Sequence, residues 1–194
     1  MKFHFTPHFT LKPPSITHNL LLPVSIMKSL TFLFMLTAST LVATVASSSS
    51  KHFHLKSSGA TNQEHNSLYV YAYHTGAGLN DAVLTKDVNT ASSAYLNGTN
   101  ALFDLNTEFP WGVVATGNTK YNSWDPIMIK AGQGSNGFSV KGNNLQWSEA
   151  SGFGGWLVCD WYHNMPQLFY LNRYYDATIP SSCSKIQLKT EYIN

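Results

Sequence analysis

From Phe53 to the end of the chain, apolar and polar residues alternate in short runs separated by Gly, Asn, Ser and Thr. A period of two is typical of β-strands, and no window of helix length shows a convincing 3.6-residue period. We therefore expect an all-β single domain, with a β-trefoil-like barrel favoured and a β-sandwich as the alternative. About twelve short strands are predicted, around residues 53–55, 68–73, 82–84, 94–96, 101–105, 111–115, 127–129, 138–140, 145–147, 156–159, 167–171 and 186–188.

The clearest local signal lies between Phe138 and Trp147, where two alternating runs flank the sequence Gly142-Asn143-Asn144. Gly and Asn tolerate a positive φ, which tight turns between antiparallel strands require. This segment therefore predicts a β-hairpin.

A different pattern precedes the strands. Met27-Lys28 is followed by an uncharged run from Ser29 to Ala46 that ends in small residues. A basic start, an apolar middle and a small-residue end predict a secretory signal peptide at 27–46. An uncleaved membrane anchor is the alternative, because the run reaches the shortest spanning length of roughly 17–25 residues. We interpret 1–26 as an artefact of start assignment or an extended, disordered n-region, 47–52 as a flexible start, and 53–194 as the secreted domain.

Removal of the leader changes the charge of what remains. Residues 1–46 hold three of the twelve basic residues and none of the ten acidic ones, so the chain from Ser47 onward has a formal charge of −1. A near-neutral domain with one arginine, Arg173, lacks the basic patch of a nucleic-acid-binding protein. It also has no basic amphipathic segment for a membrane surface. We expect a secreted monomer with no nucleic-acid partner and no membrane contact after cleavage.

Cys159 and Cys183 are the two cysteines of the chain. In an oxidising compartment an even pair predicts a disulfide, here between the 156–159 strand and the start of the last strand. A nucleophilic thiol is the less favoured alternative, since it would leave an unpaired cysteine. Separately, Asn97-Gly98-Thr99 is the one N-glycosylation sequon of the mature chain, and Asn97 is its predicted acceptor.

Two histidine–aspartate pairs are the strongest candidates for chemistry. His74 and Asp81 flank a Gly-rich turn, and Asp160 and His163 lie beside Cys159. Such pairs can act as acid and base or contribute to a metal site, which makes an extracellular hydrolase the alternative function. The simpler interpretation is that these side chains fix turns by hydrogen bonds. The spacing identifies no third metal ligand, so we expect no cofactor and assign no catalytic residue.

Aromatic residues exceed what a small core needs. Trp111, Trp147 and Trp156 lie in predicted strands and are expected in the core. Trp124 and Trp161 lie in predicted loops next to Asn or Asp, where exposed rings suit sugar stacking or a protein interface. The predicted ligand-binding residues are Trp124, Trp161, Tyr162, His163, His74 and Asp81.

Three longer motifs resemble a known family: YHTGAGLNDAVL (73–84), FDLNTEFPWGVVATG (103–117) and FGGWLVCDWYHNMPQLFY (153–170). They are similar to small secreted proteins of filamentous ascomycete fungi, known mainly as a domain of unknown function. The carboxyl-terminal half is more distantly similar to fungal cell-wall proteins associated with phialides and conidia, through the 138–147 hairpin, the 157–159 strand and Cys183. Neither group supplies catalytic residues. The resemblance implies a non-enzymatic secreted protein, retained in the cell wall or released outside the cell, that binds wall polysaccharide or a host protein surface. A secreted effector is a further alternative.

Overall fold

The computed structural model describes residues 50–115, 123–148, 150, 152–176 and 178–193. The predicted upstream segment and signal peptide lie outside these residues. The described part of the chain holds twelve strands and the short 3-10 turns η1 (Gln63–His65) and η3 (Tyr162–Asn164), and none of its helices is long and apolar enough to cross a membrane. The strands are β1 (Phe53–Ser58), β2 (Tyr69–Gly76), β3 (Leu79–Thr85), β4 (Ser93–Asn97), β5 (Asn100–Asp104), β6 (Trp111–Ala115), β7 (Trp124–Ala131), β8 (Ser139–Lys141), β9 (Asn144–Gln146), β10 (Phe153–Asp160), β11 (Pro166–Asn172) and β12 (Cys183–Tyr192).

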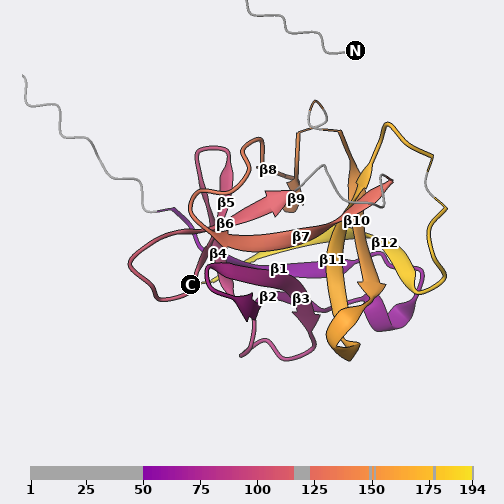
Figure 1. The fold of residues 1–194 in the computed structure, drawn as a ribbon, viewed down its shortest axis with the longest axis horizontal. Helices are drawn as coiled ribbons and strands as arrows, with labels where there is room; N and C mark the ends of the chain where they lie inside the picture. The colour runs from indigo at the N-terminus through magenta and orange to yellow at the C-terminus, as the bar shows by residue number, and fades with distance from the viewer. Residues whose placement is uncertain (1–49, 116–122, 149, 151, 177, 194) are drawn as a thin grey trace, which may run out of the picture. The chain divides into compact units, whose positions relative to one another are not determined.

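The strands form one antiparallel sheet that closes on itself as a barrel (Figure 1). Nine strands make the closed ring, in the order β1-β4-β5-β6-β7-β3-β11-β10-β12, and β12 pairs back onto β1. Strand β2 pairs with both β1 and β3, and the β8–β9 hairpin extends from β12. Each predicted strand overlaps one of these twelve. The expected all-β, single-domain barrel is therefore confirmed, with nine of its strands in the ring.

Alternate side chains along each strand point into the barrel, as the period of two requires. In β10, for example, Trp156 and Val158 belong to the main core, whereas the residues between and after them do not. Trp111, Trp147 and Trp156 are 8%, 9% and 2% exposed. The prediction that these three tryptophans are core residues is confirmed.

The other face of β10 and β11 carries a second, smaller core. Leu157 and Cys159 of β10 and Phe169 of β11 pack there, together with Cys183 at the start of β12. Cys159 and Cys183 are direct partners in the β10–β12 ladder and form a disulfide. The predicted disulfide is therefore confirmed, and it closes a loop that contains η3 and β11.

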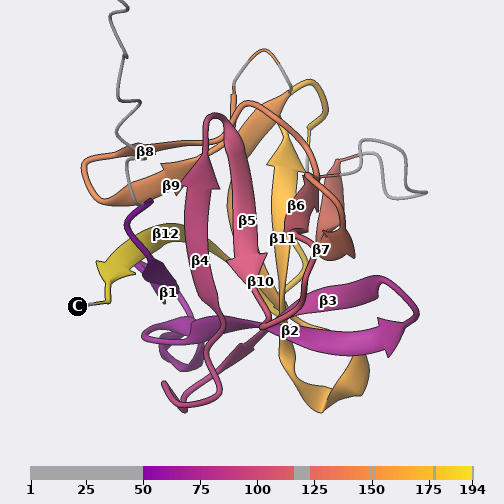
Figure 2. The ribbon, with the colours of Figure 1, turned by 90° about the vertical axis from the view of Figure 1, so that its left-hand side faces the viewer.

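The β8–β9 hairpin is the one predicted from the sequence. Lys141 pairs with Asn144, and the two residues between them, Gly142 and Asn143, have φ of 55° and 60°. A pair of positive φ values matches the right-handed twist of the flanking strands. Figure 2 shows this hairpin at the upper edge of the barrel, beside the β4–β5 hairpin.

Candidate functional site

The register of the β2–β3 hairpin decides where two of the predicted site residues point. Tyr73 pairs with Asp81, and His74 pairs with Asn80. Directly opposite residues lie on the same face of an antiparallel pair, and successive residues lie on opposite faces. The side chains of His74 and Asp81 therefore leave the hairpin on different faces, and the structure does not bring this predicted pair together.

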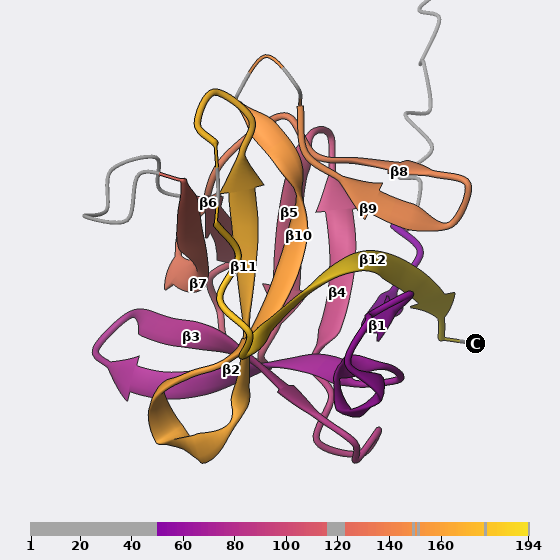
Figure 3. The same cartoon turned by 90° about the vertical axis from the view of Figure 1, so that its right-hand side faces the viewer.

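Asp81 instead contacts His163, from the connection between β10 and β11. The Nε2 atom of His163 lies 3.3 Å from Oδ2 of Asp81, and its ring lies 4.3 Å from the ring of Tyr73, centroid to centroid. Close by, the Tyr71 hydroxyl donates to the sulfur of Met165 over 3.1 Å. Figure 3 shows the β10–β11 connection turning beneath the β2–β3 hairpin. Two segments about 80 residues apart in the sequence thus meet on one face.

The backbone of this connection is unusual. His163 has φ of 70° and ψ of 8°, and Asn164 follows with φ of 52°. Asparagine tolerates left-handed backbone, whereas for most other residues it is uncommon, so His163 is the less usual of the two positions. The His163 ring contacts the Tyr73 ring and the Asp81 carboxylate. The imidazole is therefore held in one place rather than free on a loop.

We call Tyr71, Tyr73, Asp81 and His163, together with Tyr162 as the neighbour of His163 in the chain, the Tyr73–His163 surface. Tyr162 is 69% exposed, and the side chains of His163 and Asp81 are 30% and 22% exposed. Burial raises the pKa of the Tyr71 phenol, and the neighbouring Tyr73 raises that pKa further. Its hydroxyl therefore stays neutral at physiological pH. The surface combines aromatic faces with a carboxylate, an imidazole and phenol groups.

Trp124 and Trp161 lie together, and Trp161 contacts Tyr162. Trp124 is 8% exposed and belongs to the second core, and Trp161 packs edge-on against it at 5.4 Å between centroids. Trp161 also contacts Phe169 and the exposed Tyr162, at 5.5 Å and 5.6 Å. Trp124 begins β7 and its ring is buried, so the prediction that Trp124 presents an exposed ring from a loop is wrong. The two indoles instead pack next to the connection that carries Tyr162.

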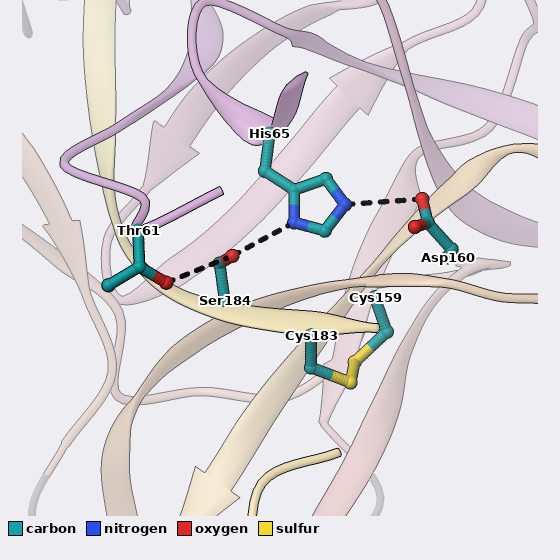
Figure 4. Close-up of a disulfide and its surroundings, with 6 residues drawn as sticks. All are labelled: Thr61, His65, Cys159, Asp160, Cys183 and Ser184. Carbon is teal, nitrogen blue, oxygen red and sulfur yellow. Dashed lines mark hydrogen bonds and ion pairs between the residues drawn. A yellow bond between two sulfur atoms is a disulfide. The ribbon is translucent and has the colours of Figure 1, made fainter. Parts of the chain in front are cut away.

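Asp160, the other aspartate of the predicted pairs, contacts His65 of η1 rather than His163. Oδ1 of Asp160 lies 3.1 Å from Nε2 of His65, and Nδ1 of His65 lies 3.1 Å from Oγ of Ser184 (Figure 4). Ser184 Oγ also accepts bonds from the Thr61 hydroxyl and the Asn62 backbone N–H. Ser184 Oγ is therefore bonded to three groups, and both ring nitrogens of His65 have polar partners.

Ser184, His65 and Asp160 are the residue types of a hydrolytic triad. The serine and the aspartate, however, have the opposite exposure to that of a triad. A nucleophilic serine must reach substrate, whereas the aspartate that orients the histidine is buried. Here Ser184 is 2% exposed and the Asp160 side chain is 62% exposed. The chain of bonds instead ties η1 to the ends of β10 and β12, next to the disulfide. The sequence analysis missed His65, since nothing local links it to an aspartate 95 positions later.

The remaining features lie elsewhere. Asn97 is exposed at the end of the β4–β5 hairpin, and its glycosylation stays a prediction. A surface cavity of about 980 Å³ lies between the β8–β9 hairpin and the start of β10, with Lys141, Gln146 and Arg173 in its lining. None of the predicted ligand-binding residues lines this cavity. Among the described residues, no three His, Cys, Asp or Glu side chains gather as a metal ion would need.

The closed ring, the disulfide and the aromatic surface define a disulfide-linked all-β barrel domain. Residues 50–192 match the model of the family described as Domain of unknown function (DUF7907), and the chain belongs to that family. The expected domain of unknown function is therefore confirmed, while the more distant likeness to phialide and conidium proteins stays a prediction. Comparisons with curated proteins and with solved structures gave no match.

Proposed function

We propose that this chain is a secreted, non-enzymatic domain that binds fungal cell-wall polysaccharide through the Tyr73–His163 surface. The observation that carries the proposal is the meeting of the Tyr73 ring of β2 with the Asp81–His163 pair, in which His163 comes from the β10–β11 connection. Tyr73 and His163 lie 4.3 Å apart, and Tyr162 is 69% exposed nearby in the chain.

The chemistry of this surface suits a sugar chain. Pyranose rings present C–H groups on their faces and hydroxyls on their edges, so they pack on aromatic rings and hydrogen-bond to polar groups at the rim. Tyr73 and Tyr162 provide rings, Asp81 accepts from hydroxyls, and His163 can donate or accept. Because the contacts to Tyr73 and Asp81 hold the His163 ring in place, His163 loses little side-chain freedom on binding.

Two further observations support a secreted protein. The Cys159–Cys183 disulfide is compatible with an oxidising, extracellular compartment, and the 27–46 pattern is that of a secretory leader. A role in the wall rests on the predicted likeness of the carboxyl-terminal half to phialide and conidium wall proteins. A hydrolase is less favoured, because Ser184 is buried and the carboxylates Asp81 and Asp160 each bind a separate histidine.

The test is retention of the secreted full-length product on insoluble β-glucan, chitin and cellulose. The informative variants are Tyr73→Ala and Tyr162→Ala. Tyr174→Ala is a matched control, since Tyr174 is 68% exposed but lies just beyond the opposite end of the β10–β11 pair, about 20 Å away by strand rise. Gln146→Ala tests the cavity beside the β8–β9 hairpin.

If the proposal holds, at least one polymer retains the wild type and the Tyr174→Ala variant. Tyr73→Ala and Tyr162→Ala should each weaken retention about tenfold, the effect of losing roughly 1.4 kcal/mol of ring contact. Loss of retention in Gln146→Ala alone would move the site to the cavity. Absence of retention on all three polymers would refute a polysaccharide-binding function and leave a protein surface as the partner to test.

A further inference from the structure

The turn that joins β4 to β5 presents the sequon in an accessible form. Asn97 pairs with Asn100 across the turn, and Gly98 and Thr99 are the two residues between them. Gly98 has φ of 60° at the first turn position, where a II′ turn needs glycine. Asn97, Gly98 and Thr99 are all exposed. In Figure 2 this turn projects at the top of the barrel wall.

Tyr95 lies two residues before Asn97 on the same face of β4. Ala94 belongs to the barrel core and Leu96 packs against it, so Tyr95 and Asn97 point outward. Two residues along a strand span about 6.6 Å, close to the width of one sugar ring attached to the asparagine. The Tyr95 ring is itself fixed, because His52 stacks on it at 5.0 Å and 10° and bonds Ser93 over 2.8 Å.

Tyr95 and Asn97 also share a surface hollow. Its volume is about 310 Å³, and its far wall comes from the β5–β6 connection, including Glu108 and Phe109. Phe109 is 48% exposed. A sugar linked to Asn97 would therefore find one fixed aromatic ring beneath it and an exposed second ring across the hollow.

We propose that Asn97 carries an N-linked glycan whose first N-acetylglucosamine packs on Tyr95. The donor would be a lipid-pyrophosphate-linked oligosaccharide of the secretory pathway. A bond forms between Asn97 Nδ2 and the anomeric carbon, the bond from that carbon to the pyrophosphate breaks, and the amide releases a proton. The packed sugar then stabilises the β4–β5 hairpin. This inference needs passage through the secretory pathway, but it is independent of polysaccharide binding.

Occupancy is tested with the full chain expressed behind a cleavable leader of a eukaryotic host, so that entry into the secretory pathway is assured. We expect the secreted wild type to lose a glycan mass on treatment with peptide-N-glycosidase. Asn97→Gln and Thr99→Ala should lack that mass, and Thr99→Ser should retain it, since serine preserves the sequon. A secreted wild type without the added mass would overturn the proposal.

Packing on Tyr95 is tested by thermal unfolding after an endoglycosidase has trimmed the glycan to one N-acetylglucosamine. The trimmed wild type should unfold about 2–4 °C above Asn97→Gln, as expected for one aromatic contact in a domain of this size. In a Tyr95→Ala background the same comparison should give no difference. An equal shift in both backgrounds would refute the Tyr95 contact, and the loss of the glycan from Tyr95→Ala would show that the ring acts during transfer instead.

Discussion

The disulfide gives a quantitative test of how this barrel is stabilised. Cys159 and Cys183 are 24 positions apart, so their bond closes a loop of about 25 residues in the unfolded chain. In the chain-entropy model such a loop removes about 12 cal/mol/K of unfolded-state entropy, or about 3.5 kcal/mol at 25 °C. In the folded state the two residues are direct partners in the β10–β12 ladder, whose backbone bonds remain without the cross-link. The stabilisation should therefore arise in the unfolded state.

We expect the double variant Cys159→Ala/Cys183→Ala to fold and to lose about 3–4 kcal/mol of unfolding free energy. Urea titration at 25 °C measures this loss, with tryptophan fluorescence as the signal, because Trp124 and Trp161 pack in or against the core that contains the disulfide. At roughly 2–4 °C per kcal/mol, the thermal midpoint should fall by about 7–14 °C.

The control is the wild type titrated in the presence of a strong reductant until equilibrium. Its unfolding free energy should match that of the double variant, because both chains lack the same loop closure. A loss below about 1 kcal/mol in the variant would refute the reasoning. It would mean that the unfolded chain is already restricted near residues 159–183 without the bond.

Two further outcomes follow from close packing and from a buried hydrogen bond. Gly112→Ala should lower the unfolding free energy by several kcal/mol and reduce the soluble yield, because the new methyl group would fall on the backbone of Gln133. Gly76 has open space around it, so Gly76→Ala should fold normally in the same expression test. Tyr170→Phe should cost about 1–3 kcal/mol at pH 7, since the Tyr170 hydroxyl donates to the buried Asp125 over 3.1 Å. Burial, reinforced by that carboxylate, raises the Tyr170 pKa in the folded state, so this stabilisation is complete below about pH 10 and declines above it. Between pH 8 and pH 11, urea titration should therefore show a larger loss of unfolding free energy for the wild type than for Tyr170→Phe. Equal losses would contradict a stabilising role for the Tyr170–Asp125 hydrogen bond.

The strands could be predicted because their signal is local. An alternation such as Leu68 to Tyr73 specifies an extended segment with one buried face within a few residues, and Gly142-Asn143 specifies its own turn. The pairing of Cys159 with Cys183 could be predicted for another reason, since two cysteines allow only one intramolecular disulfide. The closure of nine strands into a ring could not be predicted from local sequence, because β1 and β12 meet only once all intervening strands are in place.

The candidate site shows the same division at the level of single side chains. The sequence identified Asp81, Tyr162 and His163 as residues with binding chemistry, but it joined Asp81 to His74 and His163 to Asp160. Strand alternation separates the first pair, and the left-handed backbone at His163 turns its ring toward β2. Each aspartate then meets a histidine from a distant segment.

The sequence by itself thus determined the all-β class, the number of strands, the disulfide and the kinds of side chain available for binding. These properties depend on periodicity and composition, which act over a few residues. The tertiary structure alone decided that Asp81 meets His163 across 82 positions and that Asp160 meets His65 across 95. Such contacts depend on the order of the strands in the sheet and on their register. A shift of one residue in register would turn every side chain of a strand to the other face.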